Sequence, residues 1–236
     1  MSCVEPQPGA FYLTSPYPCS YLPEQQARSQ VLLPGVVPLG PAYDVLIRHG
    51  FRRSGDHIYR PRCDACQACV PVRLPIAEFQ PDRSQRRCRQ RNGDLEVRVL
   101  EPHFGAEHYA LYRRYQAVRH GGSAMDLDDS EAYRAFIVAA PGCSRLMEWR
   151  LAGAVIAVAL IDIVADGLSA VYTFYSPDHL QRGLGTLAVL EQIAWAREQG
   201  LRWLYLGFWI GASPKMAYKA RFRPLEAYRD GGWIRL

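Results

Sequence analysis

The sequence predicts an α+β fold with a loop-rich, cysteine-containing N-terminal region. Three strand-like segments follow one another at residues 145–150, 154–164 and 168–175. A segment with helical periodicity comes after them, at residues 184–199, with its apolar positions on one face. By contrast, the first 80 residues hold many of the prolines, most of the cysteines and few long periodic segments. Regular elements are therefore expected mainly in the C-terminal part of the chain.

Two elements are predicted before the cysteine-rich stretch. Residues 43–49 form a short predicted helix, and Gly50 suits its end because glycine adopts the left-handed conformation without strain. Residues 51–61 are strand-like, with a turn predicted at Gly55-Asp56.

Composition and charge restrict the class of protein. Of 236 residues, 49% are hydrophobic, which is ample for a packed core in one or two domains. The net charge of +5 permits an anionic partner without requiring one. The N-terminus lacks a charged segment followed by an apolar one, and the longest apolar run, residues 151–161, is too short to cross a bilayer. We therefore expect a cytoplasmic protein without a membrane partner.

Three cysteines have the spacing Cys63-x-x-Cys66-x-x-Cys69. The chain has seven cysteines, an odd number, so in a reducing compartment they are expected as free thiols or metal ligands. This spacing can bring thiolates onto one metal ion or cluster. It equally fits a metal-free loop packed around thiols, and both interpretations stay open.

A basic run follows at residues 82–91, DRSQRRCRQR. Its arginines are Arg83, Arg86, Arg87, Arg89 and Arg91. One interpretation is a solvated helix face, since basic runs are often only surface. The other is contact with phosphate, because guanidinium groups bind phosphate oxygens in a bidentate manner and the run contains no lysine.

The order of the C-terminal elements is typical of an acyltransferase core of the GNAT type. A helix is predicted at residues 107–120, then the three strands, then the helix that opens at a glycine turn, then a strand at residues 203–209 and a short helix around residues 215–222. In that fold an Arg/Gln-x-x-Gly-x-Gly/Ala motif binds the cofactor pyrophosphate with backbone N–H groups. Here the motif is partial, because Leu187 stands where its second small residue belongs.

Several stretches together resemble the arginyl- and leucyl-tRNA–protein transferases, and among them the bacterial aspartate/glutamate leucyltransferases. The matching stretches are PCSYLPEQQARS (18–29), GFRRSGDHIYRPRCDACQACVPVR (50–73), FQPDRSQRR (79–87), LYRRYQAVRH (111–120), YTFYSPDHLQRGLGTLAVLEQI (172–193) and YLGFWIGASPKMAYKARFRPLE (205–226). They occur in order over almost the whole chain, which makes chance agreement a poor explanation.

The resemblance implies both an architecture and a reaction. It implies an N-terminal cysteine-containing region at residues 1–80, a basic connecting segment at residues 81–105 and a GNAT-like transferase domain at residues 106–236. It implies transfer of leucine from Leu-tRNA to the α-amine of proteins that begin with Asp or Glu, which marks them for degradation. An arginine donor with the same acceptor stays open.

The resemblance also bears on the cysteines. Eukaryotic arginyltransferases carry an early Cys-x-x-Cys pair associated with a metal or iron–sulfur cluster, whereas here Leu22 stands in place of the second thiol after Cys19. A metal site would therefore use Cys19, Cys63, Cys66 and Cys69. Transfer itself is expected to need no cofactor.

The implied reaction sets three tasks: to bind the acidic side chain, to stabilise an oxyanion and to remove a proton from the amine. The cations of the segment KMAYKARFRP are candidates for the first task, and they are Lys215, Lys219, Arg221 and Arg223. Backbone N–H groups of residues 204–208 are candidates for the second. Tyr218, Lys219 and Glu226 are the candidate catalytic side chains. The five arginines of the basic run are candidates for tRNA binding.

Two functions of other kinds compete with this one. An acyl-CoA-dependent N-acetyltransferase would share the core, but the partial glycine motif argues against it. A non-catalytic RNA-binding protein would explain the basic run equally well, but it gives no reason for the aromatic-rich KMAYK segment.

Overall fold

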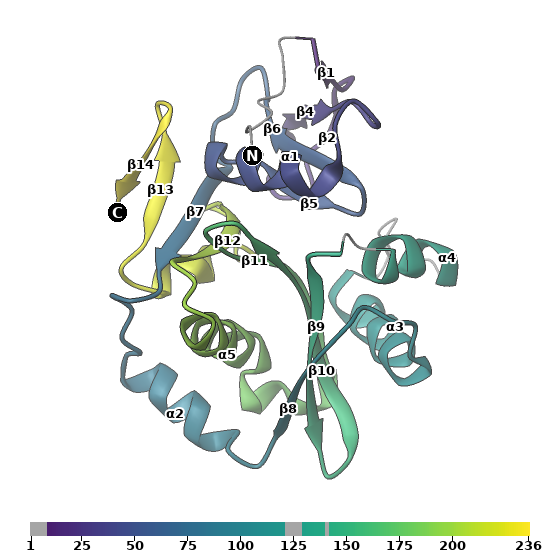
Figure 1. The fold of residues 1–236 in the computed structure, drawn as a ribbon, viewed down its shortest axis with the longest axis vertical. Coiled ribbons are helices and arrows are strands. Elements are labelled where there is room, and N and C mark those ends of the chain that lie inside the picture. Colours follow the sequence, from purple (N-terminus) through teal and green to yellow (C-terminus); the bar gives the residue numbers. More distant parts are fainter. Residues whose placement is uncertain (1–8, 121–128, 140–141) are drawn as a thin grey trace. The chain divides into compact units, whose positions relative to one another are not determined.

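The computed structural model describes residues 9–120, 129–139 and 142–236 and has a mixed α/β fold (Figure 1). Two compact units can be distinguished, each assembled from separate stretches of the chain. Unit 1 contains residues 1–79, 164–169 and 201–236, and unit 2 contains residues 80–163 and 170–200. The division at residues 80 and 105 that the resemblance implies stays a prediction. No helix in the described ranges is long and apolar enough to cross a membrane.

Unit 1 is built mainly from short strands. Its elements are β1 (Phe11–Leu13), β2 (Tyr17–Pro18), β3 (Gln26–Ala27), β4 (Ser29–Leu32), α1 (Leu39–Leu46), the 3₁₀ helix η1 (Ile47–His49), β5 (Arg52–Ser54), β6 (His57–Pro61), β7 (Val70–Pro75), β12 (Trp203–Trp209), the 3₁₀ helix η5 (Ala217–Arg221), β13 (Glu226–Arg229) and β14 (Gly232–Arg235). One sheet has the order β1-β4-β6-β5, β2 pairs with β3, and a further set of strands has the order β14-β13-β7-β12.

The predicted helix of the N-terminal region has the predicted end. Gly50 closes the helical turns with a φ of 79°, as its position suggested. The beginning lies earlier than predicted, at Leu39, because Pro41 is tolerated in the first turn, where its missing N–H would have no partner within the helix. The strand-like stretch after it forms the hairpin β5–β6, and Gly55 takes a positive φ in the turn.

The core of unit 1 joins distant parts of the sequence. Tyr43 and Ile47 pack with Val164, Trp203 and Tyr205, all of them buried. The hydroxyl of Tyr43 also lies 2.8 Å from Ser169 Oγ. Burial of a large side chain contributes about 1.5–3 kcal/mol, so residues after 200 are part of what holds the N-terminal region together.

Unit 2 contains the longer elements. They are α2 (Arg83–Arg91), β8 (Glu96–Leu100), α3 (Ala106–His120), α4 (Ser130–Tyr133), the π-helical turn η3 (Arg134–Val138), β9 (Ser144–Leu151), β10 (Ala154–Val164), β11 (Gly167–Tyr175), the 3₁₀ segment η4 (Pro177–Arg182) and α5 (Leu184–Glu198). The strand order is β11-β10-β9-β8. Figure 1 shows α3 and α4 on one side of β9 and β10, and α5 on the other side. The predicted strands and the two long helices of this part are confirmed.

One pair of neighbouring strands, β11 and β12, is parallel. β11 pairs with β12 in parallel at Gly167–Trp203, Leu168–Leu204 and Ser169–Tyr205. β12 pairs with β7 in antiparallel register on its other edge, with a bulge between Tyr205 and Gly207. The bulge bends β12 at the point where its register with β11 ends.

The basic run 82–91 is a capped helix. Asp82 accepts a hydrogen bond from the Gln85 amide at 2.8 Å, and Gln85 Oε1 accepts one from the Asp82 amide at 2.9 Å. This reciprocal pair satisfies two amides at the start of α2 that have no partner within the helix.

Replacement Asp82→Ala is expected to lower the free energy of unfolding by about 1 kcal/mol, because it removes the carboxylate that accepts the hydrogen bond from the Gln85 amide. Denaturant unfolding measures the change. Ser84→Ala is the matched control, since Ser84 is exposed in the same helix. Equal losses in the two variants would contradict the capping role.

Candidate functional site

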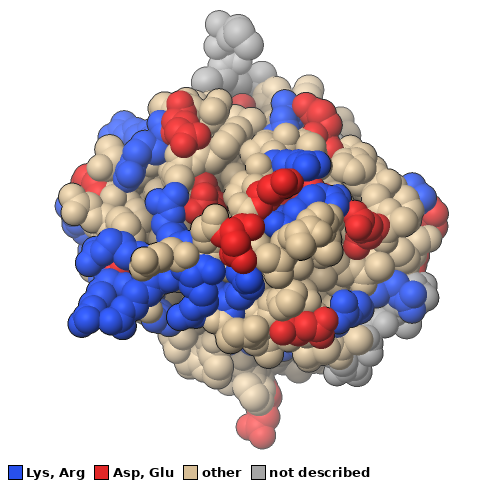
Figure 2. Space-filling model, turned by 90° about the horizontal axis from the view of Figure 1, so that it is seen from below, with Lys and Arg blue, Asp and Glu red and all other residues tan. Residues whose placement is uncertain are grey.

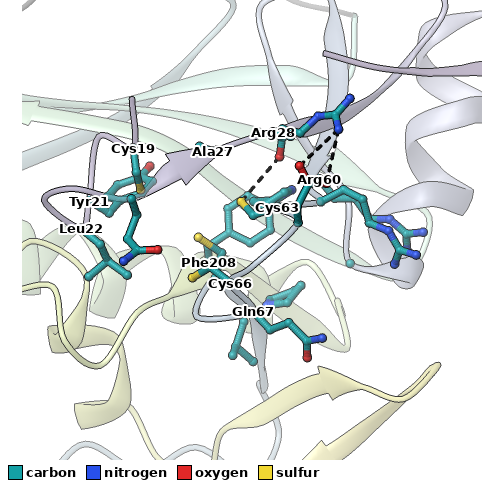
Figure 3. A pocket seen from close by; sticks show the side chains of 18 of the residues that line it. Cys19, Tyr21, Leu22, Ala27, Arg28, Arg60, Cys63, Cys66, Gln67 and Phe208 are labelled. Atoms are coloured by element: carbon teal, nitrogen blue, oxygen red, sulfur yellow. Dashed lines mark hydrogen bonds and ion pairs between the residues drawn. The ribbon is translucent and has the colours of Figure 1, made fainter. Parts of the chain in front are cut away.

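A pocket of about 1030 Å³ lies within unit 1 (Figure 3). The β2–β3 hairpin with its connecting loop, the end of β6, the cysteine loop, β12 and the β13–β14 turn all contribute to its wall. Tyr21, Leu22 and Phe208 give the wall apolar and aromatic surface. Its charged residues are four arginines and two aspartates, namely Arg28, Arg60, Arg62, Arg229, Asp64 and Asp230. A concave site with this lining can hold an extended ligand that carries an anionic group.

The structure brings the four predicted cysteines to this one pocket. Cys19, Cys63, Cys66 and Cys69 all line it as partly exposed free thiols. Burial, together with the neighbouring Cys19, Cys63 and Cys66, raises the pKa of the Cys69 thiol to about 12. Metal ligation needs thiolates, and the described residues contain no group of three or more His, Cys, Asp or Glu side chains arranged to hold a metal ion. As arranged, the thiols share a pocket without forming a ligand set, and metal binding stays a prediction.

The bulge of β12 supports one wall of the pocket. Gly207 has a φ of +78°, and a Cβ at this position would overlap the guanidinium group of Arg52. The next residue, Phe208, lines the pocket, and its carbonyl oxygen accepts a hydrogen bond of 2.6 Å from Lys219 Nζ. Lys219 thus holds the carbonyl group of Phe208, and Arg52 packs against the glycine that precedes it.

The predicted cluster of four cations does not share one face. Residues 217–221 form a 3₁₀ helix, and Lys215 lies exposed before it, whereas Lys219 within it is buried. Lys219 is buried, and burial lowers its pKa well below the usual value, with the charge of Arg52 acting in the same direction. Arg223 donates to the Leu236 carbonyl oxygen at 2.7 Å, whereas Lys215 and Arg221 are exposed. Their part in binding an acidic side chain stays a prediction.

The other candidate catalytic side chains lie in different settings. Tyr218 is exposed, with Lys219 Nζ 5.9 Å from the centre of its ring. Glu226 accepts a hydrogen bond from Arg73 Nε at 2.8 Å, and the Arg73 guanidinium stacks on Trp203 at 3.6 Å. The Glu226 carboxylate is therefore already engaged in an ion pair.

The structure places the five arginines of α2 on its solvent side, and all five are exposed. Figure 2 shows Lys and Arg gathered at the left of the view, the side on which α2 lies in Figure 1. Arg89 pairs with Glu191 at 3.0 Å, and Arg91 donates to the Gln181 carbonyl oxygen. Arg83 and Arg87, four residues apart, have no carboxylate partner among the described residues. Adjacent on one helix face, these two are the most available cations of the run.

The arginine of the partial glycine motif is occupied by a carboxylate. Arg182 donates two hydrogen bonds of 2.8 Å to Asp94, which hold the pKa of that carboxyl below its usual value. Gly183 begins α5 with a φ of 68°, and a Cβ at Gly185 would lie 3.3 Å from the Tyr175 ring. These contacts tie the turn to residues of the same unit and do not present Arg182 to a pyrophosphate.

Sequence reasoning missed the arginines of the pocket. A usable signal was the alternation in YRPRC, where Arg60 and Arg62 are two residues apart at the end of a strand candidate and directly before the cysteine loop. Residues at this spacing point to the same face of a strand.

Two family models and a solved structure are similar to this chain. The family model described as "Arginine-tRNA-protein transferase, N terminus" matches residues 17–87, and the model described as "Arginine-tRNA-protein transferase, C terminus" matches residues 107–229. The solved structure of L-PGS from Bacillus licheniformis has a TM-score of 0.50 at 15% identity, over 70% of this chain and 60% of that chain, which indicates a shared fold alone.

Curated relatives match nearly the whole length. The aspartate/glutamate leucyltransferase of Chromobacterium violaceum is 51% identical over 223 residues, which cover 94% of this chain and 92% of that protein. The aspartate/glutamate leucyltransferase of Thiobacillus denitrificans is 52% identical, with coverage of 94% and 93%. The chain belongs to the arginine-tRNA-protein transferase family.

Proposed function

We propose that this protein transfers leucine from leucyl-tRNA to the N-terminal α-amine of proteins that begin with Asp or Glu, and that it acts in the cytoplasm. The observation that carries the proposal is the identity of 51–52% with aspartate/glutamate leucyltransferases over 94% of the chain. The product would carry an N-terminal leucine, the mark for degradation that the resemblance implies.

The chemistry asks for positioning more than for activation. The amine nitrogen attacks the carbonyl carbon of the leucyl ester, the C–O bond to the tRNA ribose breaks, and the ribose hydroxyl leaves with a proton while the attacking nitrogen loses one. An N-terminal amine has a pKa of about 7.7, so a useful fraction is already neutral near pH 7. Because the ester is reactive, correct alignment supplies much of the rate, and we propose that the transfer needs no cofactor.

We further propose a GNAT-like transferase core in which β12 serves the oxyanion. Support comes from the parallel pairing of β11 with β12, which stops at Ser169–Tyr205, and from the bulge that follows. Backbone N–H groups of residues 206–208 are the proposed donors. Lys219 is proposed to act on this strand by holding the Phe208 carbonyl, and Tyr218 and Glu226 remain candidates for contact with substrate.

Transfer is tested with tRNA charged with labelled leucine or arginine and with peptides that begin with Asp, Glu, Asn or Lys. Leucine incorporation only into Asp and Glu peptides is the expected result. Arginine incorporation would keep the family and overturn the donor. If neither amino acid were incorporated although the protein bound tRNA tightly, the proposed enzymatic function would be contradicted.

For tRNA, we propose that α2 contacts the phosphate backbone. Variants Arg83→Gln and Arg87→Gln are each expected to reduce the slope of log K against log salt by about one, because each removes one phosphate contact. Filter binding or fluorescence anisotropy at several salt concentrations measures the slope.

The matched control for this prediction is Arg98→Gln. Arg98 is an exposed arginine of β8 that pairs with Glu96 at 2.8 Å, and we assign it no contact with tRNA. If Arg83→Gln and Arg87→Gln changed the slope no more than Arg98→Gln does, α2 would be only a solvated surface.

A further inference from the structure

Two arginines of the pocket wall lie next to each other on one face of a sheet. Gln30 of β4 is the cross-strand partner of Arg60 in β6, and the amide of Arg62 continues the ladder by donating to the Arg28 carbonyl oxygen at 2.8 Å. Because side chains alternate along a strand, Arg60 and Arg62 project to the same side, and both line the pocket. The backbone therefore places two arginine side chains on the same side of the strand, near enough for the charge of Arg62 to lower the pKa of Arg60.

The contacts of Arg60 are all with neutral groups. Its Nε donates to Gln30 Oε1 at 2.8 Å, its Nη1 donates to the His49 carbonyl oxygen at 3.5 Å, and the guanidinium lies 4.6 Å from the centre of the Phe51 ring. Burial lowers the pKa of Arg60, and the charge of Arg62 lowers it further. Arg60 is thus oriented and partly desolvated by groups that do not neutralise it.

The charged side chains of the wall are four arginines and two aspartates, Asp64 and Asp230, so positive charge is in excess. Arg28 is paired with Asp64 at 3.3 Å. Among residues 9–120, 129–139 and 142–236, no carboxylate pairs with Arg60 or Arg62. Two like charges held together by the fold repel each other, and this repulsion is relieved when an anion binds between them.

We propose that Arg60 and Arg62 bind the side-chain carboxylate of the acidic first residue of the acceptor protein. The inference rests on the proposed function and adds to it the residues that recognise the first residue of the acceptor protein. Two guanidinium groups offer paired N–H donors to the two carboxylate oxygens. An Asn or Gln first residue would turn an NH₂ group toward one of the cations and leave their charge unbalanced, so the site selects for charge as well as shape.

The geometry favours a single carboxylate over a nucleic-acid backbone. Proteins bind the phosphate backbone of a nucleic acid with rows of exposed cations, such as Arg83 and Arg87 on α2. The guanidinium of Arg60, by contrast, is half-buried in a concave wall that also contains the apolar surface of Leu22 and Phe208. A single side chain can enter such a pocket, whereas a continuous nucleic-acid backbone would have to pass over its opening.

The test compares the full-length variants Arg62→Gln and Arg60→Gln with the matched control Arg98→Gln. Acceptor peptides begin with Asp, Glu, Asn or Gln. Their binding is measured by anisotropy without tRNA, and leucine transfer is measured as KM for peptide and KM for Leu-tRNA. Removal of a hydrogen bond to a charged group costs about 10- to 100-fold, so the KM for Asp and Glu peptides is expected to rise by that factor. The preference for Asp over Asn should fall by the same factor, with the KM for Leu-tRNA equal to that of the control.

Three outcomes would overturn the inference. One is a raised KM for Leu-tRNA with unchanged peptide binding, which would assign the arginines to tRNA phosphate. Another is loss of the preference for Asp over Asn in Lys215→Gln but not in Arg62→Gln, which would return acceptor recognition to the KMAYK segment. The third is an unchanged preference in Arg62→Gln, which is decisive even if Arg60→Gln fails to fold, because Arg62 is exposed.

Failure of the proposed function has a different signature. It would appear as absence of leucine transfer by the unchanged protein to every peptide. The anisotropy measurement would still show whether a peptide with an acidic first residue binds and whether its binding depends on Arg62.

Discussion

Gly207→Ala is expected to lower the free energy of unfolding by about 2–4 kcal/mol. Two costs add at this position. An alanine at a φ of +78° is strained by about 1 kcal/mol or more, and its Cβ would overlap the Arg52 guanidinium and force either the side chain or the bulge of β12 to move. Chemical denaturation of the variant measures the loss. Leucine transfer should fall as well, because Phe208 and the pocket wall follow the bulge.

A second glycine separates the two costs. Gly153 has a similar φ of +86° but open space where the Cβ would stand, so Gly153→Ala should show the backbone strain alone. Combining Gly207→Ala with Arg52→Ala should recover part of the loss relative to Arg52→Ala. If Gly153→Ala and Gly207→Ala were equally destabilising, the close approach of Arg52 would not matter.

Lys219→Met is expected to change how stability depends on pH. The pKa of Lys219 is lowered in the folded protein, so between that value and about 10.4 the unfolded chain binds a proton that the folded chain does not. The free energy of unfolding of the wild-type protein should therefore rise with pH in this window, by at most about 1.4 kcal/mol per pH unit. The variant lacks this group, and its unfolding free energy should rise less steeply.

The measurement is denaturant unfolding of both proteins at several pH values from 7 to about 10. Lys219→Met also leaves the Phe208 carbonyl without its partner, which lowers stability by about 1–3 kcal/mol at every pH and does not affect the slope. The exposed Lys215→Met is the control. If the free energy of unfolding changed with pH in the same way for the wild-type protein and for Lys219→Met, the pKa of Lys219 would not be lowered in the folded protein.

Segments with strong local signals were predictable from sequence. The strands 154–164 and 203–209, the helix at 184–198 and the turn at Gly55 follow from apolar periodicity and from glycine at positions with positive φ. β7 was missed because it contains Pro71 and Pro75, which argue against a central strand, and yet it lies between β13 and β12. Its partner strands, β12 and β13, lie far away in the sequence, and no local sequence pattern predicts the pairing.

The site was harder to predict for the same reason. The cysteines were found because their spacing is local, but whether a lysine in KMAYK faces solvent or the interior depends on where β12 lies, and Lys219 faces inward toward Phe208. Likewise, Arg60 carries no sequence signal of its missing counter-ion. Only the tertiary structure shows that its neutral neighbours are Gln30 and Phe51.

The interrupted course of unit 1 has a consequence for synthesis. β7 is made early, but both of its neighbours, β12 and β13, belong to residues 201–236, which are synthesised after the rest of the two units. Until then β7 has two unpaired edges, and the core around Tyr43 lacks Trp203 and Tyr205. A chain cut short after residue 200 would therefore expose unpaired strand edges and unburied aromatic surface, the features by which cellular quality control selects chains for removal.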